Sequence, residues 1–438
     1  MRFPRPLDGI DKPREVVSWG LYDLANQSFT LLILTLLFPL YFKEVAVADD
    51  QRGDALWSAG AAAALLTVVV LSPVVGAVAD ALRARKRVLI GTGLACSALT
   101  IGLAFVAPGW WPLALALFIP ANISYQLGEN MLASFLPSLS TPRTIGRVSG
   151  IGWAMGYAGS LGLLVVVLGG VVILGWSKTP QWRPFFVLAG VWFALFMIPS
   201  ALTLREPREH TFDPERLGLG LIYRRLARTI GDAGTFRQLA RFLIAFFVYG
   251  LGVQTMIMFA AILASDFGIR DRGLVIFTLQ IALTAGVAAL LVSRFQDRFG
   301  AKRTVALFLW IWIVSCASLL LIRVVIGTDA PQWMFWAVGN GIGIGLGGIG
   351  TSSRAMVGYF APRARVGEFF GLWGMTYKFA GAVGVLAFGQ VKAWIGDAWA
   401  LALLTSFFAV GLALLARVDV IAGIRAARRA DRGSHAAP

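Results

Sequence analysis

Long apolar stretches recur along this chain, and they constrain its fold more than any other feature. Each is long enough to cross a hydrocarbon core of about 30 Å, for which about 20 residues suffice. Twelve such stretches are centred near residues 30, 67, 98, 125, 160, 194, 250, 282, 315, 343, 378 and 407. Charged residues make up only 14% of the 438 residues, against roughly 25% in soluble domains. The sequence therefore predicts an all-α membrane protein with twelve transmembrane helices.

The net charge of +16 is distributed unevenly between the predicted loops. If the N-terminus is cytoplasmic, 29 of the 39 Lys and Arg residues lie in inside segments and 8 in outside loops. This asymmetry follows the positive-inside rule with both termini in the cytoplasm, and an odd number of helices would break it. The same distribution argues against nucleic acid as the partner of the basic residues.

A long charged segment divides the predicted helices into two sets of six. We expect a cytoplasmic N-terminal segment at 1–15, a six-helix bundle at 16–204, a cytoplasmic linker at 205–236, a second six-helix bundle at 237–417 and a basic cytoplasmic tail at 418–438. Within the linker, PERLGLGLIYRRLARTI (214–230) has apolar residues on one helical face and arginines on the other. It forms either a helix lying flat on the membrane surface or a solvated linker helix.

The two halves resemble each other in their loops. The segments GAVADALRARKR (76–87) and SRFQDRFGAKR (293–303) place Asp80 and Asp297 in equivalent positions, and Pro142 and Pro362 match in a second pair of loops. A parallel repeat of two six-helix bundles is the arrangement of major facilitator transporters, which bind substrate near the midplane between the halves. We therefore expect two pseudo-symmetric bundles of the major facilitator fold.

Charged residues at the predicted inside ends of helices are candidates for gating. Asp80 and Asp297, the latter followed by Arg298, can each face a neighbouring helix N-terminus and adjacent arginines, and so hold one gate conformation by charge. Three further charges lie at such ends: Arg147, Arg354 and Glu368. These three serve either as gate charges or as anchors at the membrane surface.

Three stretches of sequence point to one branch of this superfamily. WGLYDLANQSFTLLILTLLFPLYF (19–42), FLPSLSTPRTIGRVSGIGWAMGYAG (135–159) and SSRAMVGYFAPRARVGEFFGLWGMTYKFAG (352–381) resemble the vacuole-effluxer-like family. The resemblance runs from about residue 16 to 392, and it implies the fold and a transport function. Fungal members are associated with amino-acid efflux from the vacuole, whereas Gln27 and Gly350 depart from the family pattern. The substrate therefore does not carry over, and we expect a bacterial inner membrane.

Polar residues at membrane depth line one face of the first predicted helix. They are spaced i, i+3, i+4 and i+7: Asp23, Asn26, Gln27 and Thr30. A carboxylate and two amides cannot face lipid, so the face must contact protein or a water-filled cavity. The face is either a substrate or proton site or a buried network that ties the helix to its neighbours.

The fourth predicted helix repeats this pattern. Its polar face consists of Asn122, Gln126, Glu129 and Asn130. In the fold that the resemblance implies, helices 1, 4, 7 and 10 line the cavity. Glu129 lies about 14 Å along the helix from Pro120, deep enough to serve as a proton-coupling group. The alternative is a salt bridge with Arg147 near the cytoplasmic end.

The second half offers weaker candidates and one strong one. The weaker ones are Tyr249, Gln254, Thr255, Gln280 and Asn340, each either a ligand or a helix–helix hydrogen bond. Lys378 is the strong one, because it lies about 18 Å into the eleventh helix from Val366, too deep to snorkel. It requires an anionic partner, which is either a substrate carboxylate or Asp23. We hypothesise that Lys378 binds an anionic substrate group, that Asp23 receives its amine or a proton, and that Glu129 is a second proton site.

No constellation of enzymatic or cofactor-binding residues is present in the sequence. The segment GLGGIG (345–350) lacks the strand of a dinucleotide site, so we interpret Gly339, Gly343 and Gly347 as a packing stripe. We therefore expect no enzyme, metal or cofactor. We expect a monomeric secondary transporter of a small zwitterionic or anionic metabolite, amino acids first, coupled to protons and embedded in lipid. The alternatives are an exporter of another organic solute or drug, and a non-transporting sensor or assembly factor.

Overall fold

The computed structural model describes residues 7, 10–141, 144–206, 236–327, 330–362 and 366–435. These residues form helices joined by turns and loops, and no β-strand occurs among them. The chain gathers into two compact units. The first comprises Met1–Gly53 and Ala63–Tyr223, and the second comprises Asp54–Ala62 and Arg224–Pro438. The predicted surface helix at 214–230 lies outside the described residues.

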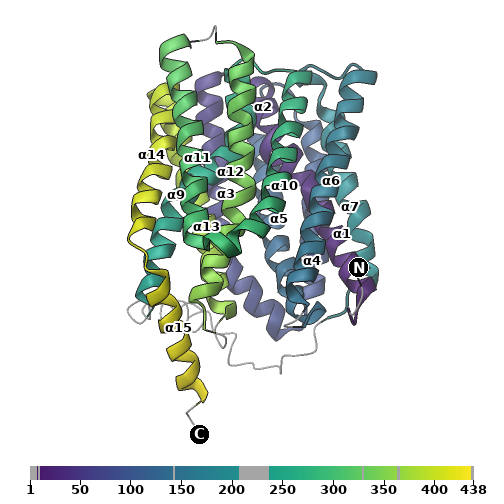
Figure 1. Ribbon diagram of the computed structural model, residues 1–438. Coiled ribbons are helices and arrows are strands. Elements are labelled where there is room, and N and C mark those ends of the chain that lie inside the picture. The colour runs from purple at the N-terminus through teal and green to yellow at the C-terminus, as the bar shows by residue number, and fades with distance from the viewer. Residues whose placement is uncertain are drawn as a thin grey trace, which may run out of the picture. The chain divides into compact units, whose positions relative to one another are not determined.

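The first unit is a bundle of long helices that run side by side (Figure 1). Its helices are α1 (Pro13–Ser28), most of α3 (Asp50–Ala81), α4 (Arg85–Gly102), α5 (Trp111–Leu139), α6 (Ile145–Ile173) and α7 (Arg183–Thr203). Here α1 packs against α6 and α7, and α4 packs against α5 and α7. The core between them is aromatic and aliphatic, as in the edge-to-face contact of Phe38 and Phe186.

The first span of this unit is bent. After α1 the chain continues as the π-helical segment η1 (Phe29–Leu36), and a bend of 42° separates it from α2 (Phe38–Tyr41) and η2 (Phe42–Val47). Pro39 accounts for the bend, because it has no N–H group and its ring clashes with the carbonyl group four residues earlier. π-Helical turns are frequent at functional sites, and this one contains Thr30, the last residue of the predicted polar face.

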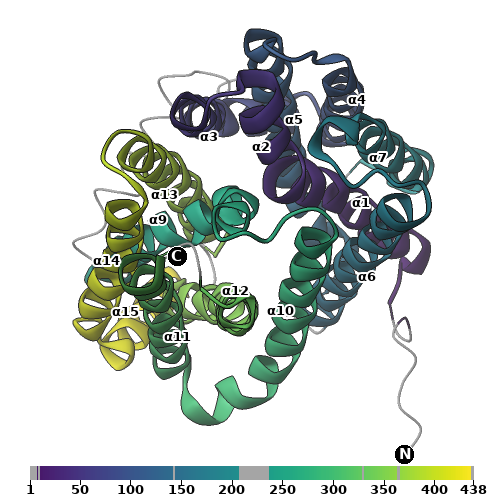
Figure 2. The same cartoon turned by 90° about the horizontal axis from the view of Figure 1, so that it is seen from above.

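The second unit repeats the packing of the first. It comprises the Asp54–Ala62 stretch of α3 together with α9 (Arg237–Asp266), α10 (Arg272–Phe299), α11 (Ala301–Leu321, continued by η7, Ile322–Ile326), α12 (Gln332–Phe360), α13 (Val366–Trp394), α14 (Asp397–Ala416) and α15 (Val420–His435). Here α9 packs against α13 and α14, and α11 packs against α12 and α14, as Figure 2 shows end-on. These pairings match those of α1 and α4 in the first unit. The predicted pair of pseudo-symmetric six-helix bundles is therefore confirmed.

The twelve predicted spans differ in apolar character. Among the described residues, eight helices are long and apolar enough to cross a membrane, or nine with the bent first span. The helices α5, α12 and α13, of 29 residues each, are not among these spans. They are also the helices that carry Asn122, Asn340 and Lys378. Part of the candidate site therefore lies on helices that do not qualify as spans by length and composition alone.

Glycines on α12 allow it to pack closely against α10. A Cβ atom at Gly343 would lie 2.8 Å from the carbonyl oxygen of Ile281, and one at Gly347 would overlap the backbone of Ala285. No larger residue fits these positions without moving α10. The prediction that this glycine run is a packing stripe is confirmed.

Candidate functional site

The predicted polar faces of α1 and α5 meet inside the first unit. Asn26, whose side chain is 1% exposed, donates a hydrogen bond from Nδ2 to Glu129 Oε1. Thr30 Oγ1 donates to the hydroxyl oxygen of Tyr125 at 2.9 Å. The Tyr125 ring stacks on Phe29 with ring centroids 5.0 Å apart. Two faces that lie about 100 residues apart in sequence thus form one continuous polar contact.

The other two polar residues of α1 face α6. Ser160 Oγ donates to Gln27 Oε1 at 3.0 Å, and a Cβ atom at Gly156 would lie 3.0 Å from Asp23 Oδ2. The absence of a side chain at Gly156 therefore makes room for the Asp23 carboxylate, which is half-buried. Because residues four apart share a helical face, Asp23 and Gln27 point to α6 while Asn26 and Thr30 point to α5.

Asn122 is the most constrained polar residue of α5. Its side chain is 0% exposed, and neither its Oδ1 nor its Nδ2 has a hydrogen-bond partner among the described residues. A buried polar atom without a partner is costly, so Asn122 departs from the usual pairing of buried polar groups. It lies two helical turns from Glu129 along the same helix, with Tyr125 between them.

The neighbouring residues of α5 serve different contacts. Asn130 Nδ2 donates to Ser72 Oγ at 2.8 Å and so ties α5 to α3 within the first unit. Gln126 is half-buried. The proposed partner of Glu129, Arg147, belongs to α6, and its side chain lies outside the described residues. The alternative of a Glu129–Arg147 salt bridge therefore stays a prediction.

Several candidates of the second unit form helix–helix hydrogen bonds. The hydroxyl groups of Tyr249 and Ser353 lie 2.8 Å apart, which joins α9 to α12. Gln280 Nε2 donates to the carbonyl oxygen of Trp336 at 2.9 Å. Asn340 Oδ1, on an exposed side chain of α12, accepts a hydrogen bond from Thr284 at 3.1 Å.

The remaining predicted candidates of the second unit are Gln254, Thr255 and Lys378. Gln254 is 7% exposed, and Thr255 Oγ1 donates to the carbonyl oxygen of Leu251 in its own helix at 2.7 Å. Lys378 is half-buried in α13. The Lys378 position is consistent with a deep lysine in a spanning helix, and its partner stays a prediction.

The gating candidates are placed at helix ends. Asp80 forms an ion pair with Arg85 across the turn between α3 and α4. The N-terminus of α4 is capped by Glu206, whose carboxylate accepts the backbone N–H groups of Arg85 at 2.5 Å and Lys86 at 2.9 Å. A carboxylate at a helix N-terminus is favoured by the helix dipole. Sequence reasoning assigned that neighbourhood to Asp80 and missed Glu206, which lies about 120 residues away.

The remaining gating candidates are only partly described. Arg298 is exposed at the end of α10, and the Arg354 guanidinium lies 5.8 Å from the ring centroid of Trp373. The side chains of Asp297 and Glu368, like that of Arg147, lie outside the described residues. No cluster of metal-ligating side chains occurs in the part of the chain that the structure describes.

Similarity to known proteins agrees with this architecture. The family model described as vacuole effluxer Atg22 like matches residues 55–428. An uncharacterized MFS-type transporter, YxiO of Bacillus subtilis, is 24% identical over 413 residues, covering 92% of this chain and 94% of that protein. Autophagy-related protein 22 of Yarrowia lipolytica is 23% identical over 299 residues, covering 62% of this chain. The match spans 50% of that fungal protein's length.

Solved structures share the fold at low sequence identity. A D-xylose–proton symporter superposes with a TM-score of 0.74 at 14% identity, covering 92% of this chain and 97% of that chain. The nucleoside transporter NupG superposes with a TM-score of 0.63 at 14% identity, covering 94% and 98%. At such identities the likeness shows the fold alone, which is that of major facilitator transporters.

Proposed function

Because the chain belongs to the vacuole effluxer Atg22-like family, whose model spans residues 55–428, we propose that this multi-pass membrane transporter moves a small zwitterionic or anionic metabolite, with amino acids the first candidates. The observation that carries the proposal is the polar contact of α1 with α5. There Asn26, Glu129 and Asn122 lie within a bundle of apolar spans. Polar and ionisable groups at membrane depth are costly, and they mark substrate and proton pathways.

A zwitterionic cargo is supported by the two signs of charge on the spanning helices. Asp23 and Glu129 in the first unit are suited to an amine or a proton, whereas Lys378 in the second unit is suited to a carboxylate. We propose that these three residues take those roles. An exporter of organic cations would be better served by acids alone, so Lys378 favours the zwitterion.

Proton coupling is the driving force that we propose for this transport. Glu129 accepts a hydrogen bond from Asn26, which orients the carboxylate without neutralising it. A carboxyl group held in this way can bind and release a proton as the transporter changes conformation. No nucleotide-binding constellation was found in the sequence, so an ion or substrate gradient is the remaining energy source.

We propose the bacterial inner membrane as the location, with both termini in the cytoplasm. The excess of Lys and Arg in the predicted inside segments supports this orientation. The Bacillus subtilis relative, which matches over nearly its whole length, supports a bacterial setting.

Counterflow in proteoliposomes tests the function. Purified protein is reconstituted with each amino acid of a panel inside the vesicles, and the entry of the labelled compound is followed. We expect accumulation of at least one amino acid by the wild type and its loss in Lys378→Ala. The absence of counterflow for every amino acid, from protein shown to be folded, would refute the amino-acid proposal, and normal counterflow in Lys378→Ala would remove Lys378 from the site.

A further inference from the structure

Lys392, in the last turn of α13, is surrounded by carboxylates within the second unit. Its side chain is 4% exposed. The ammonium nitrogen lies 2.7 Å from Asp54 Oδ2, 3.0 Å from Asp266 Oδ2 and 3.2 Å from Asp397 Oδ1. The three carboxylates come from α3, α9 and α14. One ammonium group thus joins four helices.

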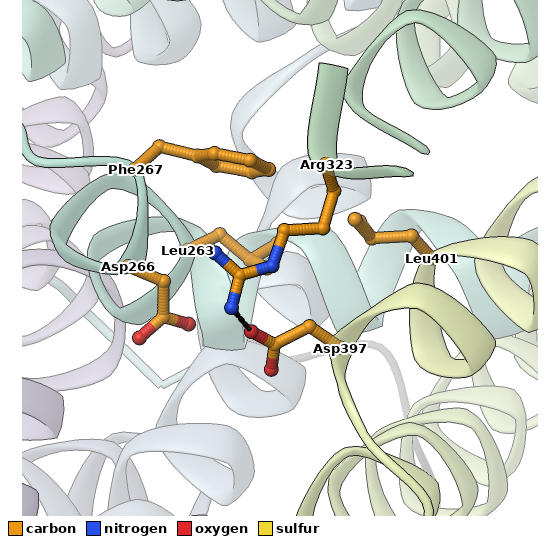
Figure 3. A pocket seen from close by; sticks show the side chains of 6 residues that line it. All are labelled: Leu263, Asp266, Phe267, Arg323, Asp397 and Leu401. Atoms are coloured by element: carbon orange, nitrogen blue, oxygen red, sulfur yellow. Dashed lines mark hydrogen bonds and ion pairs between the residues drawn. The ribbon is translucent and has the colours of Figure 1, made fainter. Parts of the chain in front are cut away.

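A second cation, Arg323, offsets part of the negative charge at this end of the unit. Arg323, in η7, donates from its guanidinium group to Asp397 Oδ2 at 2.5 Å. Figure 3 shows this guanidinium group reaching toward Asp397, with the Asp266 carboxylate nearby and apolar side chains such as Phe267 on the rim. Three carboxylates therefore face two cations, and removal of either cation leaves repulsion between the carboxylates.

Further hydrogen bonds fix the first turns of α3 in the same place. Trp57 Nε1 donates to the carbonyl oxygen of Met258 in α9 at 3.1 Å. Gln390 Nε2, in α13, donates to the carbonyl oxygen of Ala55 at 3.0 Å and to Ser58 Oγ at 3.1 Å. All of these contacts involve the stretch 54–58, so the start of α3 is bonded to two other helices by side chains as well as by charge.

The helix α3 changes unit shortly after this fastened stretch. Asp54–Ala62 belongs to the second unit, whereas the residues from Ala63 onward belong to the first. The passage coincides with the small-residue run GAAAA at 60–64. Ala61, Ala62 and Ala64 of this run are buried, and their small side chains let neighbouring helices approach closely. Movement of one half of such a transporter against the other must strain either α3 or its fastening.

We propose that Lys392, Asp54, Asp266 and Asp397 form a charge clamp that fastens the start of α3 to the second unit, and that the clamp opens and re-forms during transport. Lys392 is then a positioning residue that acts through α3. The fastening itself is independent of what the protein carries, and only the opening during transport rests on the proposed function.

The clamp is tested by the reactivity of a cysteine at position 58, one turn along α3 from Asp54. Ser58→Cys is introduced at a 0% exposed position, in full-length protein whose own Cys96 and Cys316 are replaced by Ala. The rate of maleimide modification is then measured in detergent. We expect Lys392→Met to raise this rate about tenfold or more, because it leaves three carboxylates with Arg323 as their one cation among the side chains described above. We expect Lys392→Arg, which keeps the charge, to stay near the starting rate.

A matched control removes Lys302 of α11, whose side chain contacts the C-terminal end of α14, far along that helix from Asp397. Lys302 Nζ donates to the carbonyl oxygens of Ala416 and Val418, and it contacts no clamp residue. Lys302→Met should leave the labelling rate of Ser58→Cys unchanged. A similar rise in both variants would mean general loosening of the unit and would overturn the clamp.

The remaining outcomes separate the two parts of the proposal. If Lys392→Met does not fold, Asp54→Asn replaces it, and faster labelling is again expected because the pair loses a charge. Unreactive Ser58→Cys in folded clamp variants would overturn the clamp. The labelling needs no substrate, so it tests the fastening of α3 even if the protein transports no amino acid. Wild-type transport rates in Lys392→Met protein whose labelling has risen would overturn the opening of the clamp during transport.

Discussion

Replacement of Asn122 by leucine separates stability from function in the first unit. Asn122 is 0% exposed, and its two amide atoms have no partner among the described residues. Each such atom costs about 1–3 kcal/mol, and leucine of similar size removes both costs. Because hydrogen bonds in membrane proteins contribute less than this range suggests, we expect Asn122→Leu to raise the free energy of unfolding by about 2 kcal/mol.

The expected shift is measurable as a melting temperature. For a unit of this size 1 kcal/mol corresponds to about 2–4 °C, so the melting temperature of purified Asn122→Leu should rise by about 4–8 °C. Transport should fall by about tenfold in the same variant, since a guest that used the amide loses a hydrogen bond. Counterflow of the amino acid identified for the wild type measures this fall.

Asn130→Leu is the matched control for this experiment. It makes the same change two turns further along α5, but it removes the hydrogen bond to Ser72. The melting temperature of this control should therefore fall, by an amount corresponding to about 1 kcal/mol. If Asn122→Leu lowers the melting temperature as Asn130→Leu does, Asn122 has a structural partner and the reasoning is refuted.

Three further changes test particular contacts. Gly347→Leu should lower the free energy of unfolding by about 1–3 kcal/mol, seen as a lower melting temperature, or prevent folding, because the new side chain would overlap the Ala285 backbone. An unchanged melting curve would contradict the close packing of α10 and α12. Glu206→Gln should lower the free energy of unfolding by about 1 kcal/mol in thermal denaturation, since α4 loses its charged N-terminal cap. This destabilisation should be smaller in high salt, because salt screens the charge of the Glu206 carboxylate. A double-mutant cycle of Tyr249→Phe and Ser353→Ala should give a coupling of about 0.6 kcal/mol by thermal unfolding, and zero coupling would exclude the hydrogen bond.

The polar face of α1 shows how far sequence reasoning reaches. The i, i+3, i+4, i+7 spacing from Asp23 to Thr30 required a buried environment, and the parallel pattern on α5 suggested what it faces. The structure adds that the face is divided, with Asn26 directed to Glu129 and Gln27 directed to Ser160. Which neighbour each residue meets depends on the rotation of the helix, and a spacing pattern fixes that only to within about one residue position, or 100°.

The charged residues at helix ends show which contacts cannot be predicted from the sequence. Lys392, which no pattern in the sequence singled out, is buried in the last turn of α13 beside Asp54, 338 positions away in sequence. Glu206 likewise caps a helix about 120 residues distant. Both contacts are set by which helix ends meet in the folded bundle. Charges at helix ends carry no periodic pattern, so their partners are found only in three dimensions.

We propose that the polar contact of α1 and α5 couples proton movement to substrate transport. The direct measurement is lumenal pH, followed with a trapped indicator in proteoliposomes while the amino acid identified by counterflow is added outside. We expect a substrate-dependent pH change with the wild type, and counterflow without a pH change with Glu129→Gln. An undiminished pH change in Glu129→Gln would contradict the account.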